Sequence, residues 1–340
     1  MAGTVWLANL PAQAAELFSF GTSNAMARVV IVQDPKATVA YKPVNDRVQT
    51  MVNRGLINLT GKATPAEAWR SLVSTNDVVG IKIFSAAGAL CGTRPAVVAA
   101  VVRGLLDAGV PHEHIVIWDR YADDLDDAGF FQLADQLNVR AAGAAESGYD
   151  PTNFYNPDTA IIGNLVWGDL EFGQKKGGGV GRKSFVSKLV SRQITKIISI
   201  APLLDENAAG LCGHFFSLAL GSVDNIRRFE DDPDRLAVAL PEIYALPALG
   251  DRVALNITDA LLGQYSGGPR GFLQYSTALD QIWFSRDPVA LDTLALLELQ
   301  RERHAVNMPA FRPNLEIYTN AVLLELGVSD PRKIQIQKIR

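Results

Sequence analysis

Apolar positions in the first part of the chain follow two different periods. The segments "ARVVIVQD" (27–34) and "DVVGIKIF" (77–84) are short β-branched runs, which are typical of buried strands. Between them, apolar residues recur at helical spacing through 44–61 and again through 64–73, where Thr64 is a suitable N-cap. The pattern predicts two strands separated by two helices.

A strand, a helix and a second strand follow one another closely between residues 77 and 120. After the strand 77–84 comes the helical pattern "TRPAVVAAVVRGLLDAG" (93–109), with Pro95 in its first turn, and then the strand "HIVIWDR" (114–120). Short connections of this kind are typical of a right-handed βαβ unit. The unit predicts a parallel sheet.

The pattern changes between residues 140 and 200 to loops and alternating strands. The segments "NLVWGDLEFG" (164–173), "KSFVSKLV" (183–190) and "TKIISIAPL" (195–203) carry this alternation. They predict an antiparallel β excursion.

Longer elements return beyond residue 200. Residues 213–229 and 236–246 predict helices, and 252–263 predicts a strand. A further strand leads into a helix that has Asp287 as its N-cap. The final "KIQIQKIR" alternates as an edge strand does.

The predicted fold is α/β, with a mixed, largely parallel sheet, flanking helices and an antiparallel β excursion around 140–200. Its length of 340 residues suits two domains or one large α/β domain. The apolar N-terminal arm is expected either to pack on its own domain or to reach a neighbouring subunit. The expected parts are the arm (1–26), an α/β half (27–140), a β-rich excursion (141–200) and a second α/β half (201–340).

Charge and apolar content exclude some classes of function. A net charge of −4 argues against a nucleic-acid-binding protein, which needs a broad basic face. No apolar run approaches the ~18 residues that span a bilayer. Ala12-Gln13-Ala14 resembles a signal-peptidase site but has no basic region before it, so we expect no leader.

Three cofactor motifs are missing or incomplete. The two cysteines, Cys91 and Cys212, form no C-x-x-C pair, so we expect buried free thiols and no iron–sulfur cluster. No G-x-G-x-x-G opens a helix after a strand, which argues against a dinucleotide. In "KKGGGVGRKS" (175–184), Arg182 replaces the glycine that a phosphate loop needs before Lys-Ser. This stretch predicts a basic turn between strands, with an anion-binding flap as the alternative.

Charged residues stand at the ends of three predicted strands. Lys82 lies inside an otherwise apolar strand, Asp119 and Arg120 end the next strand, and Asp259 lies near the end of a third. In open α/β sheets, ligands bind beyond the carboxyl ends of parallel strands. We therefore expect these side chains to share one site. Lys82 would anchor an anion, form a structural ion pair with Asp119 or Asp259, or lie in water on an edge strand.

Two further stretches extend the candidate site. Asp205 follows the strand at 195–203 and is, with Asp259, a candidate catalytic carboxylate, and His214 near a helix start is a candidate acid–base group. Gly267, Gly268 and Arg270 lie in the glycine-rich "YSGGPRGF", which could wrap a ligand with its backbone N–H groups. Asp287 is also a candidate ligand-binding residue, although its simplest role is the helix cap.

The order of these motifs resembles the family catalogued as domain of unknown function 362. The resemblance rests on "DVVGIKIF", "TRPAVVAAVVRGLLDAG", "IVIWD", "ITDALLGQYSGGP" and "SRDPVALD", and covers most of residues 27–300. It implies an α/β fold; some members are described as iron–sulfur centre proteins, a label that the missing cysteines exclude here. Members often carry a twin-arginine export leader, which implies a periplasmic or extracellular location. They also carry a lysine-and-histidine segment, of which this chain has only His214.

Two functions are consistent with the sequence. The first is binding of a small anion at the sheet edge, alone or with a Mg²⁺, Ca²⁺ or Mn²⁺ ion held by Asp119 and Asp259, in a hydrolase or isomerase. Lys82, Arg120 and Arg270 would hold the anion. The second is a non-catalytic protein that self-assembles into a ring or filament through its N-terminal arm and terminal edge strand. A homo-oligomer is expected in either case.

Overall fold

The computed structural model describes residues 4–5, 26–173, 179–309 and 312–340. These residues form a central sheet with the strand order β1-β15-β2-β14-β13-β12-β5-β6-β7. The strands are β1 (Thr4–Val5), β2 (Ala27–Gln33), β5 (Val79–Lys82), β6 (Ile115–Asp119), β7 (Arg140–Gly143), β12 (Lys196–Leu204), β13 (Val253–Gln264), β14 (Ser276–Ser285) and β15 (Ile334–Ile339).

The sheet is mixed and mostly parallel, as predicted. Strands β13, β12, β5, β6 and β7 run parallel, and β15 is parallel to β2. Strand β14 is antiparallel to both of its neighbours, β13 and β2. The predicted βαβ unit is confirmed, because β5 and β6 are parallel neighbours joined through α5 (Pro95–Asp107).

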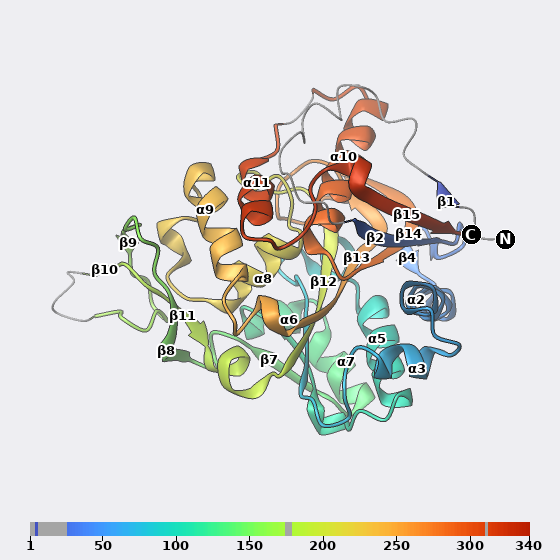
Figure 1. Cartoon of the computed structure of the whole chain (residues 1–340), viewed down its shortest axis with the longest axis horizontal. Coiled ribbons are helices and arrows are strands. Elements are labelled where there is room, and N and C mark those ends of the chain that lie inside the picture. Colours follow the sequence, from blue (N-terminus) through green and yellow to red (C-terminus); the bar gives the residue numbers. More distant parts are fainter. Residues whose placement is uncertain (1–3, 6–25, 174–178, 310–311) are drawn as a thin grey trace.

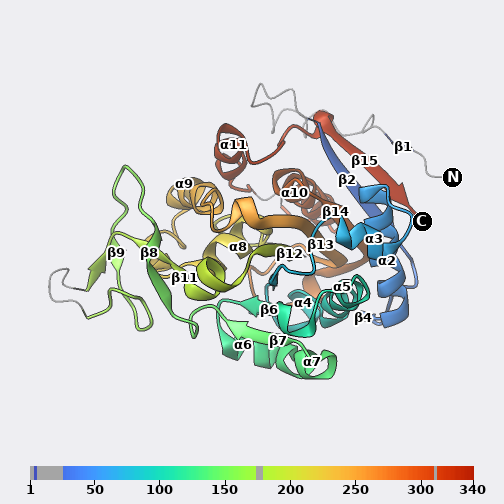
Figure 2. The same cartoon turned by 60° about the horizontal axis from the view of Figure 1, so that its bottom comes forward.

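Helices cover both faces of the sheet (Figures 1 and 2). The helices on one face pack on a core that includes Val48, Trp69 and Ile117. Those on the other face pack on a core that includes Phe215, Leu240 and Leu291. The first layer contains α2 (Asn45–Thr60), α3 (Pro65–Arg70), α5 and α7 (Phe130–Leu137), and the second contains α8 (His214–Ser222), α9 (Pro233–Tyr244), α10 (Pro288–Ala305) and α11 (Glu316–Leu323).

Predicted capping residues begin two of these helices. Thr64 accepts a hydrogen bond from the backbone N–H of Glu67, and the Glu67 side chain returns one to Thr64, which completes a capping box before α3. Asp287 accepts from the N–H of Ala290 at 2.8 Å and caps α10. Local chemistry therefore sets these helix starts.

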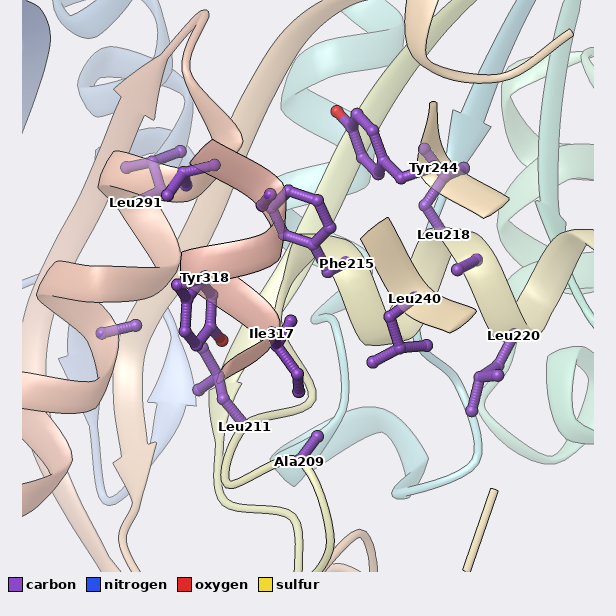
Figure 3. Close-up of a cluster of buried hydrophobic side chains, with 14 of the residues drawn as sticks. Ala209, Leu211, Phe215, Leu218, Leu220, Leu240, Tyr244, Leu291, Ile317 and Tyr318 are labelled. Carbon is purple, nitrogen blue, oxygen red and sulfur yellow. The ribbon is translucent and has the colours of Figure 1, made fainter. Parts of the chain in front are cut away.

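In the second helical layer, aromatic packing joins α8 to its neighbours (Figure 3). The ring of Phe215 lies 4.6 Å from that of Tyr244 on α9 and 6.2 Å from that of Tyr318 on α11, measured between centroids. These contacts fix α8 relative to α9 and α11, and α8 contributes to the candidate site.

The antiparallel excursion is present, but its boundaries differ from those predicted. It consists of the pair β8 (Tyr149–Tyr155) and β11 (Ser184–Ser187) and the pair β9 (Gly163–Asn164) and β10 (Val180–Gly181). The segment predicted as its last strand is β12, which lies in the parallel sheet between β13 and β5. Helices cover both faces of β12, so its apolar run reflects burial on both sides rather than a half-exposed strand.

Shorter elements complete the described chain. Most of the predicted strand 164–173 is a turn, and the strand expected through residue 190 gives way to a π-helical turn, Leu189–Gln193. The remaining elements are β3 (Thr38–Val39), β4 (Lys42–Pro43), α4 (Gly88–Cys91), α6 (Ala122–Asp127) and the 3₁₀ turns at His112–His114, Ile226–Arg228, Gly250–Arg252, Leu273–Tyr275 and Pro331–Lys333. No helix in the described ranges is both long and apolar enough to span a membrane.

The terminal strand lies beside the start of the chain. Strand β15 is parallel to β2 on one side, and on the other side Thr4 and Val5 pair with Gln337 and Ile336. These two residues of the arm thus pack on their own chain; the rest of the arm, apart from Met26, lies outside the described residues.

Candidate functional site

Lys82 and Asp119 form a buried ion pair at the carboxyl ends of two neighbouring strands. Lys82 is the last residue of β5 and Asp119 the last of β6. The Lys82 Nζ lies 2.8 Å from the Asp119 Oδ1 and 2.9 Å from the Ser217 Oγ of α8, and it also donates to the carbonyl of Ile83. The fold therefore brings these two strand-end charges together, in the structural ion pair that was one of the three alternatives predicted for Lys82.

The Asp119 carboxylate has further donors. Its Oδ2 accepts from the N–H and the O–H of Ser85, both at 2.7 Å, and its Oδ1 accepts from the N–H of Arg120 at 2.8 Å. Asp119 is 5% exposed and Lys82 0%. Burial lowers the pKa of Lys82, and the Asp119 carboxylate partly opposes this change.

Glycine at position 221 allows α8 to approach this pair. A Cβ there would lie 2.3 Å from the Lys82 Cε and 2.9 Å from its Nζ. Ser217, one turn earlier, accepts the hydrogen bond from Lys82. Gly221 and Ser217 therefore form the face of α8 that packs against the Lys82 side chain.

Asp259 faces the opposite side of the sheet and pairs with Arg94. The Asp259 Oδ1 lies 2.8 Å from the Arg94 Nη1, and its Oδ2 accepts from the Arg94 backbone N–H at 2.9 Å. Both residues are buried, and Arg94 directly precedes α5. Along β13, Ile257 joins the core on the α5 side, whereas Thr258 contacts α8, so alternation directs Asp259 away from Lys82. The structure does not bring Lys82 and Asp259 into one site.

His214 lies inside the layer between α8 and the sheet. It is 0% exposed; its Nδ1 is 2.8 Å from the Ser199 Oγ, and its Nε2 is 3.2 Å from the Thr258 Oγ1. Burial lowers the His214 pKa to about 3, so the imidazole is neutral near pH 7. Its two ring nitrogens are thus hydrogen-bonded to hydroxyl groups of β12 and β13.

Asp292 of α10 caps the start of α8. Its Oδ1 accepts from the backbone N–H of His214 at 2.9 Å, and its Oδ2 accepts from that of Phe215 at 3.2 Å. Burial raises the Asp292 pKa to about 7. The sequence left open whether Asp292, one turn after Asp287, faces the site or solvent, and the structure buries it.

Asp205 and the glycine-rich loop do lie together. The Asp205 Oδ2 accepts from the Gly268 N–H at 3.0 Å, while its Oδ1 is buried without a hydrogen-bond partner in the structure. Gln264 holds the same loop by donating to the carbonyls of Gly268 and Arg270. Gly267 and Gly268 have φ values of +111° and +73°, which explains why glycine occupies both positions. The Arg270 side chain is exposed.

Asp287 lies at the other edge of the sheet. Its second carboxylate oxygen accepts from the Val328 N–H at 2.9 Å, and burial raises its pKa to about 6. A cavity of about 540 Å³ adjoins it where β2 begins and β14 ends; its lining includes Arg28, Arg286 and Glu325. Asp287 is therefore separated from the strand-end charges at the carboxyl edge.

Arg120 directly follows Asp119 at the carboxyl end of β6. It is half-buried, its Nη1 donates to the Leu220 carbonyl at 2.7 Å, and its guanidinium lies 5.1 Å from the ring of Tyr121. Its Nε is buried and has no hydrogen-bond partner in the structure. Within the described ranges, no carboxylate lies within ion-pair distance of this guanidinium.

The structure also places the remaining cofactor candidates. Among the described residues, no three His, Cys, Asp or Glu side chains are arranged to hold a metal ion. Cys91 and Cys212 are free and buried, and both belong to a small core cluster with Ala87 and Leu204. Residues 175–178 of the glycine stretch at 175–184 lie outside the described residues, whereas Val180 and Gly181 form β10 and Ser184 begins β11.

No protein-family model matches the chain, and no curated protein matches its sequence. The resemblance to the domain of unknown function 362 family therefore rests on the sequence motifs alone and stays a prediction. The fold and the contacts described above define an α/β protein whose strand-end charges are mostly paired within the interior.

Proposed function

We propose that this protein binds a small anion, a carboxylate or a phosphate, over the carboxyl ends of β5, β6 and β12, with Arg120 making the direct contact. The observation that carries the proposal is the half-buried Arg120 guanidinium, which has no carboxylate within ion-pair distance among the described residues. A planar guanidinium suits bidentate binding of carboxylate and phosphate oxygens.

Neighbouring residues support this role. The Leu220 carbonyl and the Tyr121 ring hold the guanidinium in place, which reduces the entropy lost on binding. Lys82 and Asp119 shape the edge and do not contact the anion, because both are buried and paired. The carboxylates of Asp224 and Glu230 also interact electrostatically with Arg120, so a ligand competes with them and we expect moderate affinity.

The proposal contains no metal and no chemical step. Asp119 and Asp259 are each paired with a basic side chain, and they face different partners. His214 is enclosed by α8 and the sheet, so the predicted hydrolase or isomerase role gains no support from its position.

Isothermal titration calorimetry with inorganic phosphate and with malonate tests the proposal. We expect wild-type protein to bind at least one of these probes. Arg120→Ala should bind the same probe about tenfold or more weakly, because the substitution removes a charge-assisted hydrogen bond. Arg286→Ala is the matched control, because Arg286 is exposed at the opposite edge of the sheet. No binding by the wild type, or equal binding by Arg120→Ala, would refute the proposal.

A further inference from the structure

The end of α8 lies beside the antiparallel excursion (Figures 1 and 2), and two buried aspartates join these segments. Asp224 follows closely after α8, and its Oδ2 accepts from the N–H of Leu170, between β9 and β10, at 2.7 Å. In return, the Asp169 Oδ1 accepts from the Asn225 N–H at 2.9 Å. Each aspartate thus binds the backbone N–H of the residue that follows the other. We call residues 169–170 and 224–225 the aspartate clasp.

The aspartate clasp buries two carboxylates without a cation at ion-pair distance. The second oxygen of Asp224 accepts from the Phe185 N–H, and that of Asp169 accepts from the Val166 N–H at 2.8 Å. Asp224 is 1% exposed and Asp169 is 7% exposed. Within the described part of the chain, no basic side chain lies within ion-pair distance of either carboxylate. Buried like charges repel each other, so a proton on one of them relieves the repulsion.

Arg120 is held at the same end of α8 as Asp224. Its Nη1 donates to the carbonyl of Leu220, which precedes Asp224 by about one helical turn. Burial raises the pKa of Asp224 to about 6; the Asp169 charge acts in the same direction, whereas the backbone N–H donors and the Arg120 guanidinium lower it. The proton affinity of Asp224 therefore depends on the charge at Arg120.

Other charged and titratable groups act on Arg120 or on the aspartate clasp. Lys82 is paired with Asp119 and Glu230 with Arg227, so each of these charges is balanced locally. The Tyr149 hydroxyl is neutral near pH 7, because burial raises its pKa. The groups that interact electrostatically with Arg120, Asp224 or Asp169 are Lys82, Tyr149, Arg228 and Glu230. Asp224 is the more deeply buried of the two unpaired clasp carboxylates, which makes it the better proton acceptor.

We propose that the anion site at Arg120 takes up its anion together with a proton, which Asp224 accepts from solvent. This inference rests on the proposed function. An anion on the guanidinium places a negative charge near Asp224 and cancels the favourable effect of Arg120 on the Asp224 carboxylate. The carboxylate then binds a proton more readily. Because linkage is reciprocal, a protonated Asp224 strengthens anion binding by the same factor.

The coupling operates over a defined range of pH. Below about pH 6, Asp224 is already protonated in the free protein, so anion binding takes up no further proton. Above this value the free carboxylate is ionised, and the bound anion raises its pKa. Proton uptake is therefore largest just above about pH 6, and the anion affinity falls as the pH rises through this region.

Isothermal titration calorimetry with sulfate, which carries no titrating proton between about pH 5 and pH 8, tests the proposal. Measurements in buffers with different ionisation enthalpies give the number of protons taken up on binding. We expect wild-type protein to take up a fraction of a proton, and its Kd for sulfate to be about fivefold or more weaker at about pH 8 than at about pH 5. Asp224→Asn removes the titrating group and should abolish both effects.

Glu230→Gln is the matched control, because it removes another carboxylate that acts on Arg120 but is paired with Arg227. This variant should keep the proton uptake. Circular dichroism shows whether each variant is folded. If Asp224→Asn does not fold, carbon-13 NMR of the aspartate carboxyl groups in wild-type protein gives the same answer, because sulfate should move one titration that lies near pH 6 to higher pH.

The outcomes separate this inference from the proposed function. Sulfate binding without proton uptake, or uptake that persists in folded Asp224→Asn, would overturn the inference and leave the anion site in place. Binding of phosphate or malonate but not of sulfate would assign the proton to the ligand and overturn the role of Asp224. Absence of binding by all three anions would refute both proposals.

Discussion

The Nζ of Lys82 lies 2.8 Å from the Oδ1 of Asp119, and both side chains are buried where β5 and β6 end. The ammonium also donates to Ser217, and the carboxylate also accepts from Ser85, so each charge has hydrogen bonds beyond the ion pair. An ion pair of this kind joins two parallel strands to α8.

Removing one partner of this pair should strongly destabilise the protein. Lys82→Met leaves the Asp119 carboxylate buried without its cation, and we expect the free energy of unfolding to fall by about 3–5 kcal/mol. Urea unfolding followed by circular dichroism measures the change. Arg47→Ala, which breaks an exposed ion pair with Asp34, should cost less than about 1 kcal/mol. Equal effects of the two substitutions would contradict this account of the buried pair.

Gly221→Ala should destabilise the protein, although alanine usually favours a helix over glycine by roughly 1 kcal/mol. The new methyl group would lie 2.3 Å from the Lys82 Cε, and overpacking of this kind costs about 1–3 kcal/mol. Urea unfolding again gives the measurement. In the double variant with Lys82→Ala, the added cost of the methyl group should largely disappear; a stabilised Gly221→Ala would show that α8 does not approach the lysine so closely.

His214 should make the protein less stable as the pH falls. Its pKa is about 3 in the folded state and near 6.5 when exposed, so between these values the unfolded state binds the proton and the folded state does not. This contribution to stability is complete above about pH 6.5 and declines by about 1.4 kcal/mol per pH unit on acidification. Unfolding midpoints measured across this range should depend less on pH in His214→Gln than in the wild type. Parallel pH curves for the two proteins would rule out a buried neutral imidazole.

Asp292 should make the protein less stable as the pH rises, which is the opposite of the effect of His214. Burial raises its pKa to about 7 from 3.8, so between these values the folded state holds a proton that the unfolded state has lost. Its contribution to stability is therefore complete below about pH 3.8 and is lost as the pH rises to about 7. Asp292→Asn keeps an acceptor for α8 and carries no titrating group, so it should gain stability relative to the wild type over this range. Thermal unfolding at a series of pH values checks the sign, and a constant difference between the two proteins would contradict it.

Arg228 should hold the antiparallel excursion to the body. Arg228→Met removes its hydrogen bonds to Tyr155, Ile161 and Ser184. We expect amide hydrogen exchange across residues 155–184 to speed up by roughly tenfold or more, with the central sheet little changed. Arg227→Met, which removes an exposed side chain paired with Glu230, is the control and should leave exchange unaltered. Uniformly faster exchange over the whole chain would instead assign Arg228 to global stability.

Sequence periodicity predicted the helices and strands better than it predicted which strands pair with one another in the sheet. The strands β2, β5, β6 and β13 and the helix α5 follow from local patterns, because burial on one or both faces leaves a period in the sequence. The prediction that β12 belongs to the antiparallel excursion was wrong. Its apolar run is compatible with either a parallel or an antiparallel sheet, so the sequence pattern does not identify its neighbours.

The candidate site shows where local reasoning stops. Lys82 and Asp119 could be paired from the sequence because they end adjacent strands of one βαβ unit. Arg94 was missed as the partner of Asp259, since 165 residues separate the two and the pairing depends on which face of β13 each side chain occupies. A signal was present in "TRPAV", where an arginine stands directly before an apolar helix.

By itself, the sequence determined the α/β class, the βαβ unit and the caps at Thr64 and Asp287, because each of these depends on residues within a few turns of one another. Only the tertiary structure decided that His214 is enclosed, that Asp259 faces Arg94, and that Arg120 is half-buried without an ion-pair partner among the described residues. Burial and ion pairing depend on which distant segments pack together, and that choice is made by the whole core.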